Sequence, residues 1–244
     1  MDRKLLILNA DDLGYDPAVT RGIIESMRQG VVTSTTLMVN LEDSQSAAQA
    51  GAGLAIGLHL NLARGAPVSA GFPASLLQDG QLVEARAGEL PGEVVLPEVL
   101  AQLDRLEALT GRPATHLDVH KHLHQHPGIL EGLIEAARGR GLPVRAITPT
   151  MRQTLRAGKV RTTDHFIGDA GKTAYWTLEQ LEADLAGLQP GTTELMCHPG
   201  YAPQTLKSGY SAQREVELAT FLHPRARVLL EQAGVELADF GRLP

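Results

Sequence analysis

The chain has 244 residues, of which 43% are hydrophobic, and its formal net charge is -6. This composition supplies a sizeable core and excludes an intrinsically disordered chain. The acidic balance argues against a nucleic-acid partner, because such binding needs clustered Lys and Arg. The single cysteine, Cys197, excludes an internal disulfide framework. No apolar run approaches the roughly 20 residues of a membrane span, and the apolar run near the N-terminus is too short for a signal peptide. We therefore expect a cytoplasmic protein that has no membrane partner.

Short apolar runs alternate with amphipathic segments along the whole chain. The apolar runs predict strands at 5–9, 35–40, 54–60, 114–120, 144–148, 165–168, 194–198 and 235–238. The segments between them carry apolar residues at helical spacing and start signals such as Asp16-Pro17 and the Thr177–Gln180 capping box. Such alternation implies a parallel sheet, either closed as a barrel or open and doubly wound.

We favour an α/β fold that forms a single distorted (β/α) barrel domain over residues 1–244. About seven or eight mostly parallel strands are expected in it. The segment 65–92 has no clear period and several Gly and Pro residues, so we expect a long loop over one end of the barrel.

Polar residues stand where several predicted strands end. Asp11 and Asp12 follow the first strand, His59 lies near the end of the third, and His198 ends a later one. Each has an ordinary structural interpretation, because Asp commonly caps helices and a lone buried His is more often a core residue than a ligand. The C-terminal ends of the strands carry the active site in barrel enzymes, however, so their shared location favours one functional site.

The segment 115–126, THLDVHKHLHQH, has a strict alternation. In an extended chain one face would hold every second residue from position 116: His116, Asp118, His120, His122 and His124. A buried strand with an imidazole-rich face indicates metal binding, because each buried polar group needs a partner. The alternative is a solvated histidine-rich loop. The alternation alone allows His120 and His122 equally as ligands.

Two imidazoles and a carboxylate leave coordination positions open for water and substrate, as catalytic metal sites do. We therefore predict a metal-dependent hydrolase with a site built from Asp11, Asp12, His59 and one histidine of the tract, His120 or His122.

Six motifs in order resemble those of the YdjC-like carbohydrate deacetylases, which include the chitooligosaccharide deacetylases. These motifs are NADDLG, GVVTSTTLMVN from Gly30, IGLHLNL, PATHLDVHKHLHQHP, MCHPGY and R-x-x-E-L from Arg214. The resemblance covers nearly the whole chain and implies a distorted barrel related to polysaccharide deacetylases. It also implies a homodimer and one divalent metal ion, magnesium or zinc, held by Asp12, His59 and His120, with Asp11 as the general base.

The resulting hypothesis is removal of the N-acetyl group from an acetylated mono- or oligosaccharide. Asp11 would take the proton of a metal-activated water, and His198, from its strand-end position, is the candidate acid for amine expulsion. Asp118, His122 and His124 are candidates for orienting the ligating imidazoles.

Three other functions remain as alternatives. A 2-His-1-carboxylate iron oxygenase uses the same ligand types, but no all-β jelly roll is predicted. A metal-dependent phosphoesterase barrel commonly adds several Arg or Lys residues near the metal. A non-catalytic metal- or sugar-binding protein on this scaffold would have no need of Asp11 as an uncoordinated base.

Overall fold

One parallel sheet forms the centre of the computed structural model, which describes residues 3–243. Its seven strands follow the order β4-β3-β2-β1-β6-β5, and β7 pairs with the start of β1. The strands are β1 (Lys4–Leu13), β2 (Ser34–Leu37), β3 (Ile56–Leu60), β4 (Leu117–Val119), β5 (His165–Ile167), β6 (Gly191–Cys197) and β7 (Glu236–Leu237). All six pairings between them are parallel, which confirms the sheet type expected from the βα alternation.

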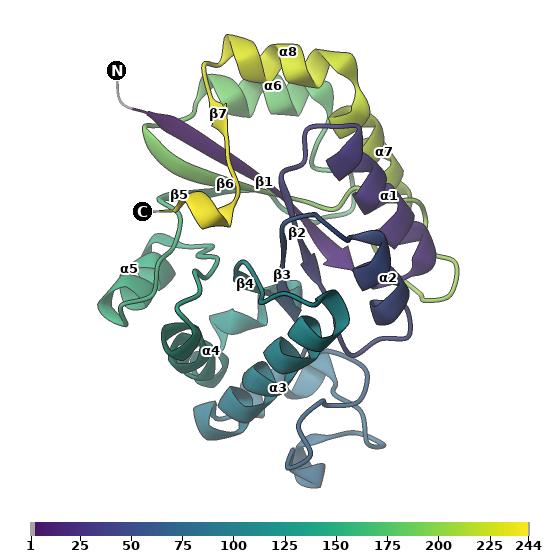
Figure 1. The fold of residues 1–244 in the computed structure, drawn as a ribbon, viewed down its shortest axis with the longest axis vertical. Helices are drawn as coiled ribbons and strands as arrows, with labels where there is room; N and C mark the ends of the chain where they lie inside the picture. The colour runs from purple at the N-terminus through teal and green to yellow at the C-terminus, as the bar shows by residue number, and fades with distance from the viewer. Residues whose placement is uncertain (1–2, 244) are drawn as a thin grey trace.

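Helices surround the sheet, from α1 and α2 at the right of Figure 1 through α3 at the bottom to α4 and α5 at the left. They are α1 (Pro17–Arg28), α2 (Ser44–Ala50), α3 (Gly92–Thr110), α4 (Pro127–Arg140), α5 (Pro149–Ala157), α6 (Leu178–Ala186), α7 (Ala212–Leu222) and α8 (Pro224–Gln232). The Asp16 and Thr177 side chains cap α1 and α6 by accepting from Ala18 N and Gln180 N, as predicted.

Two helices were not predicted from the sequence. α2 consists of small and polar residues, and α5 buries only Met151 and Leu155 among otherwise polar positions. Neither segment has the apolar stripe on which a sequence-based prediction depends. The connection from β3 to α3, predicted as a long loop, contains two short 3₁₀ helices, η1 (Ala74–Leu76) and η2 (Glu84–Glu89).

The expected strand at 144–148 is wrong. Within residues 3–243, that segment forms only one parallel bridge, between Val144 and Leu117 of β4. Val144 N donates to Arg161 O (2.9 Å). The segment lies beside β4 at the edge of the sheet, between the two edge strands β4 and β5, which are not paired with each other. This irregular closure distorts the barrel, and it directs the side chain of Arg145 inward, where it is fully buried.

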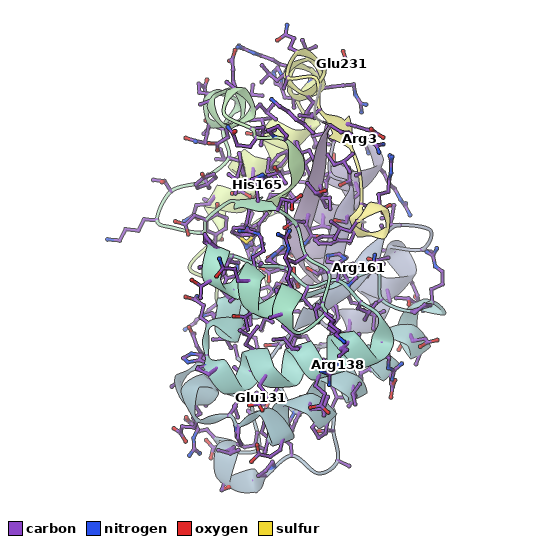
Figure 2. The ribbon with its side chains drawn as sticks, turned by 90° about the vertical axis from the view of Figure 1, so that its left-hand side faces the viewer. Arg3, Glu131, Arg138, Arg161, His165 and Glu231 are labelled. Atoms are coloured by element: carbon purple, nitrogen blue, oxygen red, sulfur yellow. The ribbon has the colours of Figure 1, made fainter. Side chains whose placement is uncertain are left out.

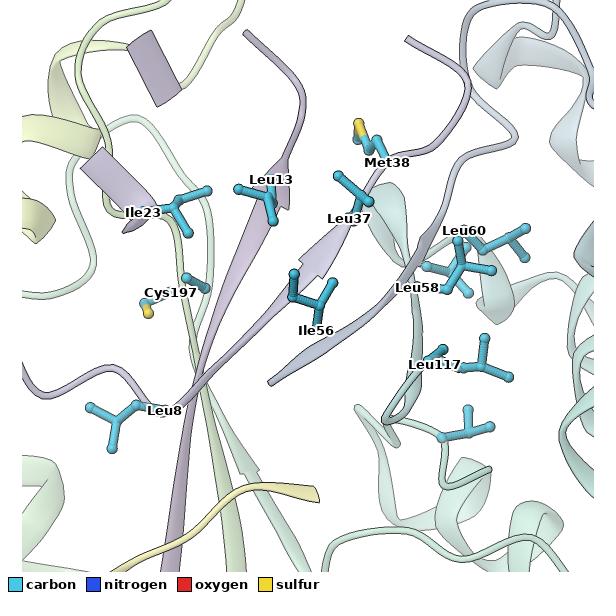
Figure 3. Close-up of a cluster of buried hydrophobic side chains, with 14 of the residues drawn as sticks. Leu8, Leu13, Ile23, Leu37, Met38, Ile56, Leu58, Leu60, Leu117 and Cys197 are labelled. Atoms are coloured by element: carbon cyan, nitrogen blue, oxygen red, sulfur yellow. The ribbon is translucent and has the colours of Figure 1, made fainter. Parts of the chain in front are cut away.

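Apolar residues of the strands and of the inner helix faces form the core. Figure 3 shows Leu37, Leu58 and Leu117, from β2, β3 and β4, in this cluster. On the outer side, α4 presents Glu131 and Arg138 to solvent, as Figure 2 shows. Within residues 3–243, none of the helices combines the length and the apolar character that crossing a bilayer requires.

Candidate active site

The C-terminal end of β1 places two adjacent carboxylates on the same side of the sheet. Neighbouring residues of a regular strand point to opposite faces, but Asp12 has a left-handed backbone (φ 74°). The register of β1 against β2 shifts between Ala10 and Leu13, as at a bulge. Both Asp11 and Asp12 therefore line one cavity. A left-handed conformation is costly for a residue other than glycine, and such strain is characteristic of functional sites.

Asp12, His59 and His120 converge on a triangle of ligand atoms. Asp12 Oδ1 lies 3.2 Å from His59 Nε2 and 3.1 Å from His120 Nδ1, and the two imidazole nitrogens are 3.2 Å apart. Metal–ligand bonds of about 2.0–2.2 Å join atoms at such separations. All three side chains are buried, and their arrangement could hold a metal ion. In the part of the chain that the structure describes, Asp12 Oδ1 and His120 Nε2 have no hydrogen-bond partner.

Asp118 determines which nitrogen of His59 is free to act as a ligand. Asp118 Oδ1 lies 2.6 Å from His59 Nδ1, and Asp118 Oδ2 accepts a hydrogen bond from Thr36 Oγ1 (2.9 Å). The proton is thus held on Nδ1 and Nε2 is left for the cation. Burial by itself lowers the pKa of His59, but the carboxylates of Asp118, Asp12 and Asp11 raise that pKa to about 10 in the absence of a metal. A cation that binds Nε2 therefore displaces a proton from it.

Arg214 of α7 holds the other oxygen of Asp12. Its Nη2 donates to Asp12 Oδ2, and its Nε donates to the Tyr210 carbonyl (3.0 Å). Burial favours the neutral carboxyl, yet the Arg214 guanidinium and His120 keep the pKa of Asp12 well below its usual range. The carboxylate is therefore ionised and turned with Oδ1 towards the imidazoles.

Asp11 belongs to a buried ion-pair network centred on Arg145. Arg145 donates to both of its carboxylate oxygens (2.6 and 2.7 Å), and Asn9 Nδ2 adds a third hydrogen bond (2.9 Å). The same guanidinium contacts Asp118 (3.0 Å) and Glu194 (2.7 Å). Although burial raises the pKa of Asp11, Arg145 holds that pKa below its usual range. Asp11 is ionised without contacting the metal triangle through its own hydrogen bonds.

His198 follows β6 and lines the same cavity. Its backbone N–H donates to Glu217 Oε2 (2.5 Å), and the ring of Tyr210 lies 5.2 Å from the imidazole, centroid to centroid. Burial lowers the pKa of His198 to about 4, and burial raises the pKa of Glu217 to about 7. The His198 imidazole is consequently neutral at pH 7.

The expectation that five polar residues share one face of an extended 116–124 strand is wrong. β4 ends at Val119, and the next residues form a 3₁₀ helix, η3 (His120–Gln125), in which Lys121 and His122 have left-handed backbones. Side chains alternate between two faces only while the chain is an extended, pleated strand. The alternation therefore ends where the chain leaves the sheet.

The remaining candidates therefore separate in space. His122 Nε2 lies 3.2 Å from Met196 Sδ, and His124 is fully buried. Within residues 3–243, neither His122 nor His124 forms a hydrogen bond with His59 or His120, whereas Asp118 contacts His59. His116 lies deeper, stacked on Phe240 at 3.7 Å.

A cavity of about 500 Å³ opens above these groups. Its charged lining consists of four acidic residues (Asp11, Asp12, Glu84 and Asp169) and four basic residues (Arg64, Lys121, Lys207 and Arg214), beside the histidines 59, 120, 122 and 198. Lys121 is paired with Glu84 and Arg214 with Asp12. Two of the four basic residues are thus already paired with acidic ones, which leaves Arg64 and Lys207 as the other basic side chains of the lining.

Comparison with known proteins places this site in a family. A sequence profile of the YdjC-like proteins matches residues 5–232. The chain belongs to the YdjC-like protein family. Two relatives, the chitooligosaccharide deacetylases of Serratia marcescens and of Yersinia pestis (strain Pestoides F), are each 36% identical to this YdjC-like protein. In each case the alignment covers 97% of this chain and 98% of the relative. The family predicted from the six motifs is confirmed.

Solved structures share the fold of this YdjC-like protein. A candidate cellobiose-phosphate cleavage protein from Enterococcus faecalis V583 has a TM-score of 0.86 at 28% identity, covering 98% of both chains. The catalytic domain of a peptidoglycan N-acetylglucosamine deacetylase from Eubacterium rectale has a TM-score of 0.54 at 12% identity, with 96% of this chain and 87% of that chain covered. The second likeness concerns the fold alone, and it agrees with the (β/α) barrel-like fold expected from the sequence.

Sequence reasoning missed two arginines of this YdjC-like protein. Arg145 lies in a segment that was predicted as an ordinary strand, and no signal there distinguishes it from a surface residue. Arg214 did stand within a family motif, R-x-x-E-L, which was noted without a role. The same helical spacing brings Glu217 under His198.

Proposed function

We propose that this YdjC-like protein is a metal-dependent carbohydrate deacetylase, which hydrolyses the N-acetyl group of an acetylated mono- or oligosaccharide. The observation that carries the proposal is the ionised Asp11, which lies beside the Asp12–His59–His120 triangle with both of its carboxylate oxygens hydrogen-bonded to Arg145. A carboxylate so placed serves as a base rather than a ligand. The activity in the names of the 36% identical relatives supports the same reaction.

Each residue of the site has one role in this proposal. Asp12, His59 and His120 would hold a single divalent cation, and Asp118 orients His59 through Nδ1. When bound, such an ion lowers the pKa of a water molecule and polarises the acetyl carbonyl. Asp11 accepts the proton of the attacking water, and the two hydrogen bonds from Arg145 keep the carboxylate aimed at it.

Amine departure needs a proton, and His198 is the residue proposed to donate it. The His198 imidazole is neutral at pH 7, since burial lowers its pKa to about 4. As negative charge develops on the tetrahedral intermediate, this imidazole would take up a proton from solvent and pass it to the leaving nitrogen. The proton that Asp11 takes from water then returns to solvent, so one proton enters and one leaves in each turnover.

Acetate release tests the proposal directly. The purified protein is incubated with a panel of N-acetylated mono- and disaccharides, with and without chelator, and then reconstituted with magnesium or zinc. The expected result is acetate from at least one sugar, lost on chelation and restored by one of the two ions. No acetate from any sugar after reconstitution with either ion would refute it. Light scattering and cell fractionation test the homodimer and the cytoplasmic location that also belong to the proposal.

A phosphoesterase is the second candidate. Four basic residues, Arg64, Lys121, Lys207 and Arg214, line the cavity, as a phosphate site would need. Two of them are already paired with acidic residues, which leaves less positive charge for a phosphate. Phosphate release from sugar phosphates, measured beside acetate release, separates the two reactions.

A further inference from the structure

The imidazole of His198 lacks the kind of partner that orients His59. Asp118 contacts Nδ1 of His59 at 2.6 Å and so fixes the direction of that ring. Within residues 3–243, Nδ1 of His198 is buried and has no hydrogen-bond partner. The ring of Tyr210 lies beside the His198 imidazole, 5.2 Å away between centroids. The direction of this imidazole therefore depends on the backbone that carries it and on the ring that packs against it.

Glu217 of α7 holds both the backbone of His198 and the ring of Tyr210. Its Oε2 accepts from the His198 backbone N–H (2.5 Å), and its Oε1 accepts from the Tyr210 hydroxyl. The same hydroxyl accepts from the backbone N–H of Tyr175 (3.2 Å). Glu217 is fully buried, where hydrogen bonds to a carboxylate are stronger than in water. One side chain thus joins the proposed acid to the ring beside it.

The turn after His198 leaves its backbone little freedom to adjust. β6 ends immediately before it, and Gly200 N donates to the Arg214 carbonyl (3.2 Å). The turn also packs closely on α1, because a Cβ atom at Gly22 would lie only 2.6 Å from the Cα of Gly200. With the backbone fixed on both sides, a hydrogen bond at the His198 N–H sets the direction of the side chain.

Glu217 belongs to a row of polar residues on the inner face of α7. Arg214, Glu217 and Thr220 follow at every third position, and all three are buried. Arg214 contacts Asp12, while Thr220 Oγ1 donates to the Trp176 carbonyl (3.1 Å). In the described part of the chain, Glu217 forms no hydrogen bond or ion pair with the metal triangle. The helix therefore supports the metal triangle and the His198 side of the site through different residues.

We infer that Glu217 is a positioning residue for amine departure, which directs the His198 imidazole into the catalytic cavity through the His198 N–H and the Tyr210 hydroxyl. The inference rests on the proposed deacetylase function and deepens it. Glu217 does not line the cavity, so it acts through His198 and transfers no proton to the substrate itself.

Removing the carboxylate tests the inference. Glu217→Met leaves the His198 N–H and the Tyr210 hydroxyl without their acceptor. Acetate release from an N-acetylated sugar should slow by about 10–100-fold, because a misdirected acid loses most of its effect. Hydrolysis of an activated aryl acetate should slow by less than about threefold, since its leaving group needs no proton. Metal affinity, measured by competition with a chromophoric chelator, should match the wild type. General damage to the site would lower both rates alike, so the ratio of amide rate to ester rate identifies positioning.

Two further variants complete the series. Glu217→Gln keeps the volume and one acceptor oxygen for the His198 N–H, so it should regain most of the amide rate that Glu217→Met loses. Glu231→Gln removes an exposed carboxylate of α8, labelled in Figure 2, and as the matched control it should leave both rates unchanged. If Glu217→Met does not fold, Tyr210→Phe removes the hydroxyl alone and should lower the same ratio. An unchanged ratio there, or equal losses on amide and ester in Glu217→Met, would overturn the inference.

A double variant tests whether Glu217 acts through His198. Adding Glu217→Met to His198→Gln should slow amide hydrolysis no further, because residues that act in one step are not additive. Additive losses would overturn the inference.

Nuclear magnetic resonance separates this inference from the proposed function. Histidine-labelled, metal-loaded protein is compared with Glu217→Met, and the His198 signals are assigned by their loss in His198→Gln. The backbone amide and imidazole signals of His198 should both move in Glu217→Met and stay in place in Glu231→Gln. A moved imidazole signal supports the positioning role even if no sugar releases acetate. An imidazole signal that stays in place in Glu217→Met would overturn that role and leave the deacetylase proposal intact.

Discussion

Arg145 donates a hydrogen bond to each carboxylate oxygen of Asp11, at 2.6 and 2.7 Å, although 134 residues separate the two in the chain. The guanidinium is fully buried and also contacts Asp118 and Glu194. A single cation therefore compensates three buried carboxylates. Arg145 thus contacts both the proposed base, Asp11, and Asp118, the residue that orients His59.

Replacing Arg145 by Met leaves Asp11 and Glu194 without their buried ion-pair partner, whereas Asp118 keeps His59. Removing one partner of a buried ion pair costs about 3–5 kcal/mol, so the free energy of unfolding of Arg145→Met should fall by that amount in urea denaturation. Arg156→Met is the control, because its pair with Asp164 is exposed (51% and 42% of the side chains) and worth less than about 1 kcal/mol. Equal losses in the two variants would contradict the network. Arg145→Lys keeps the positive charge but loses the bidentate hydrogen bonding to Asp11. It should therefore lower the rate of acetate release more than it lowers the free energy of unfolding.

The two adjacent aspartates should fail in different ways. Asp11→Asn should lower kcat for acetate release by about 10²–10⁴-fold, because an amide is no base. Its metal content should match that of the wild type. Asp12→Asn should lose the metal itself, since Asp12 Oδ1 is the oxygen of the triangle. Metal content after gel filtration is measured beside acetate release, and an Asp11→Asn protein with a near wild-type rate would remove Asp11 from the role of base.

Arg214 is predicted to act on the metal through Asp12. Arg214→Lys keeps the positive charge but loses the joint contact with Asp12 Oδ2 and the Tyr210 carbonyl. Metal affinity should fall by about 10–100-fold, as when other partners of metal ligands are removed. Competition with a chromophoric chelator measures it. Arg225→Lys, in an exposed pair with Glu182, is the control, and unchanged affinity in both variants would exclude a positioning role.

The acid role of His198 predicts a dependence on the leaving group. In His198→Gln the hydrolysis of an N-acetylated sugar should slow by about 10²-fold, because the departing amine needs a proton. An activated aryl acetate should be much less affected, since a phenolate leaves without one. His122→Gln changes the other cavity histidine that lies outside the metal triangle and should spare the amide rate. Equal loss on amide and ester in His198→Gln would show that the residue acts in another step.

Buried neutral histidines should make the metal-free protein sensitive to acid. Burial keeps the pKa of His124 well below the ordinary value of 6.5. The unfolded chain therefore binds the proton first, and stability is lost as the pH falls below 6.5. Between pH 7.5 and 5.0, the free energy of unfolding should fall by about 2 kcal/mol less in His124→Met than in the wild type. This difference follows from a slope of about 1.4 kcal/mol per pH unit below pH 6.5. Urea denaturation of chelated protein measures this. His126→Met, at a half-buried histidine, is the control, and parallel pH profiles for wild type and His124→Met would contradict the prediction.

Much of the fold could be predicted because its signals are local. The apolar runs and the Asp16 and Thr177 caps located most strands and two helix starts, since period and capping depend on neighbouring residues. The strand at 144–148 failed for the opposite reason. Whether a short apolar run becomes a strand depends on a partner edge, and β4 offers Val144 only one bridge.

The sequence by itself determined that Asp11, Asp12, His59 and His120 belong to one end of a parallel sheet, because the carboxyl ends of parallel strands meet at one edge. Only the tertiary structure shows that His120, and not His122, lies beside Asp12 and His59, since the left-handed turn at 121–122 takes His122 out of the strand alternation. It alone also supplied Arg145 and Arg214, the cations that keep Asp11 and Asp12 ionised. The reason is physical: a local pattern records which face a residue occupies, whereas a buried ion pair joins residues that are distant in sequence.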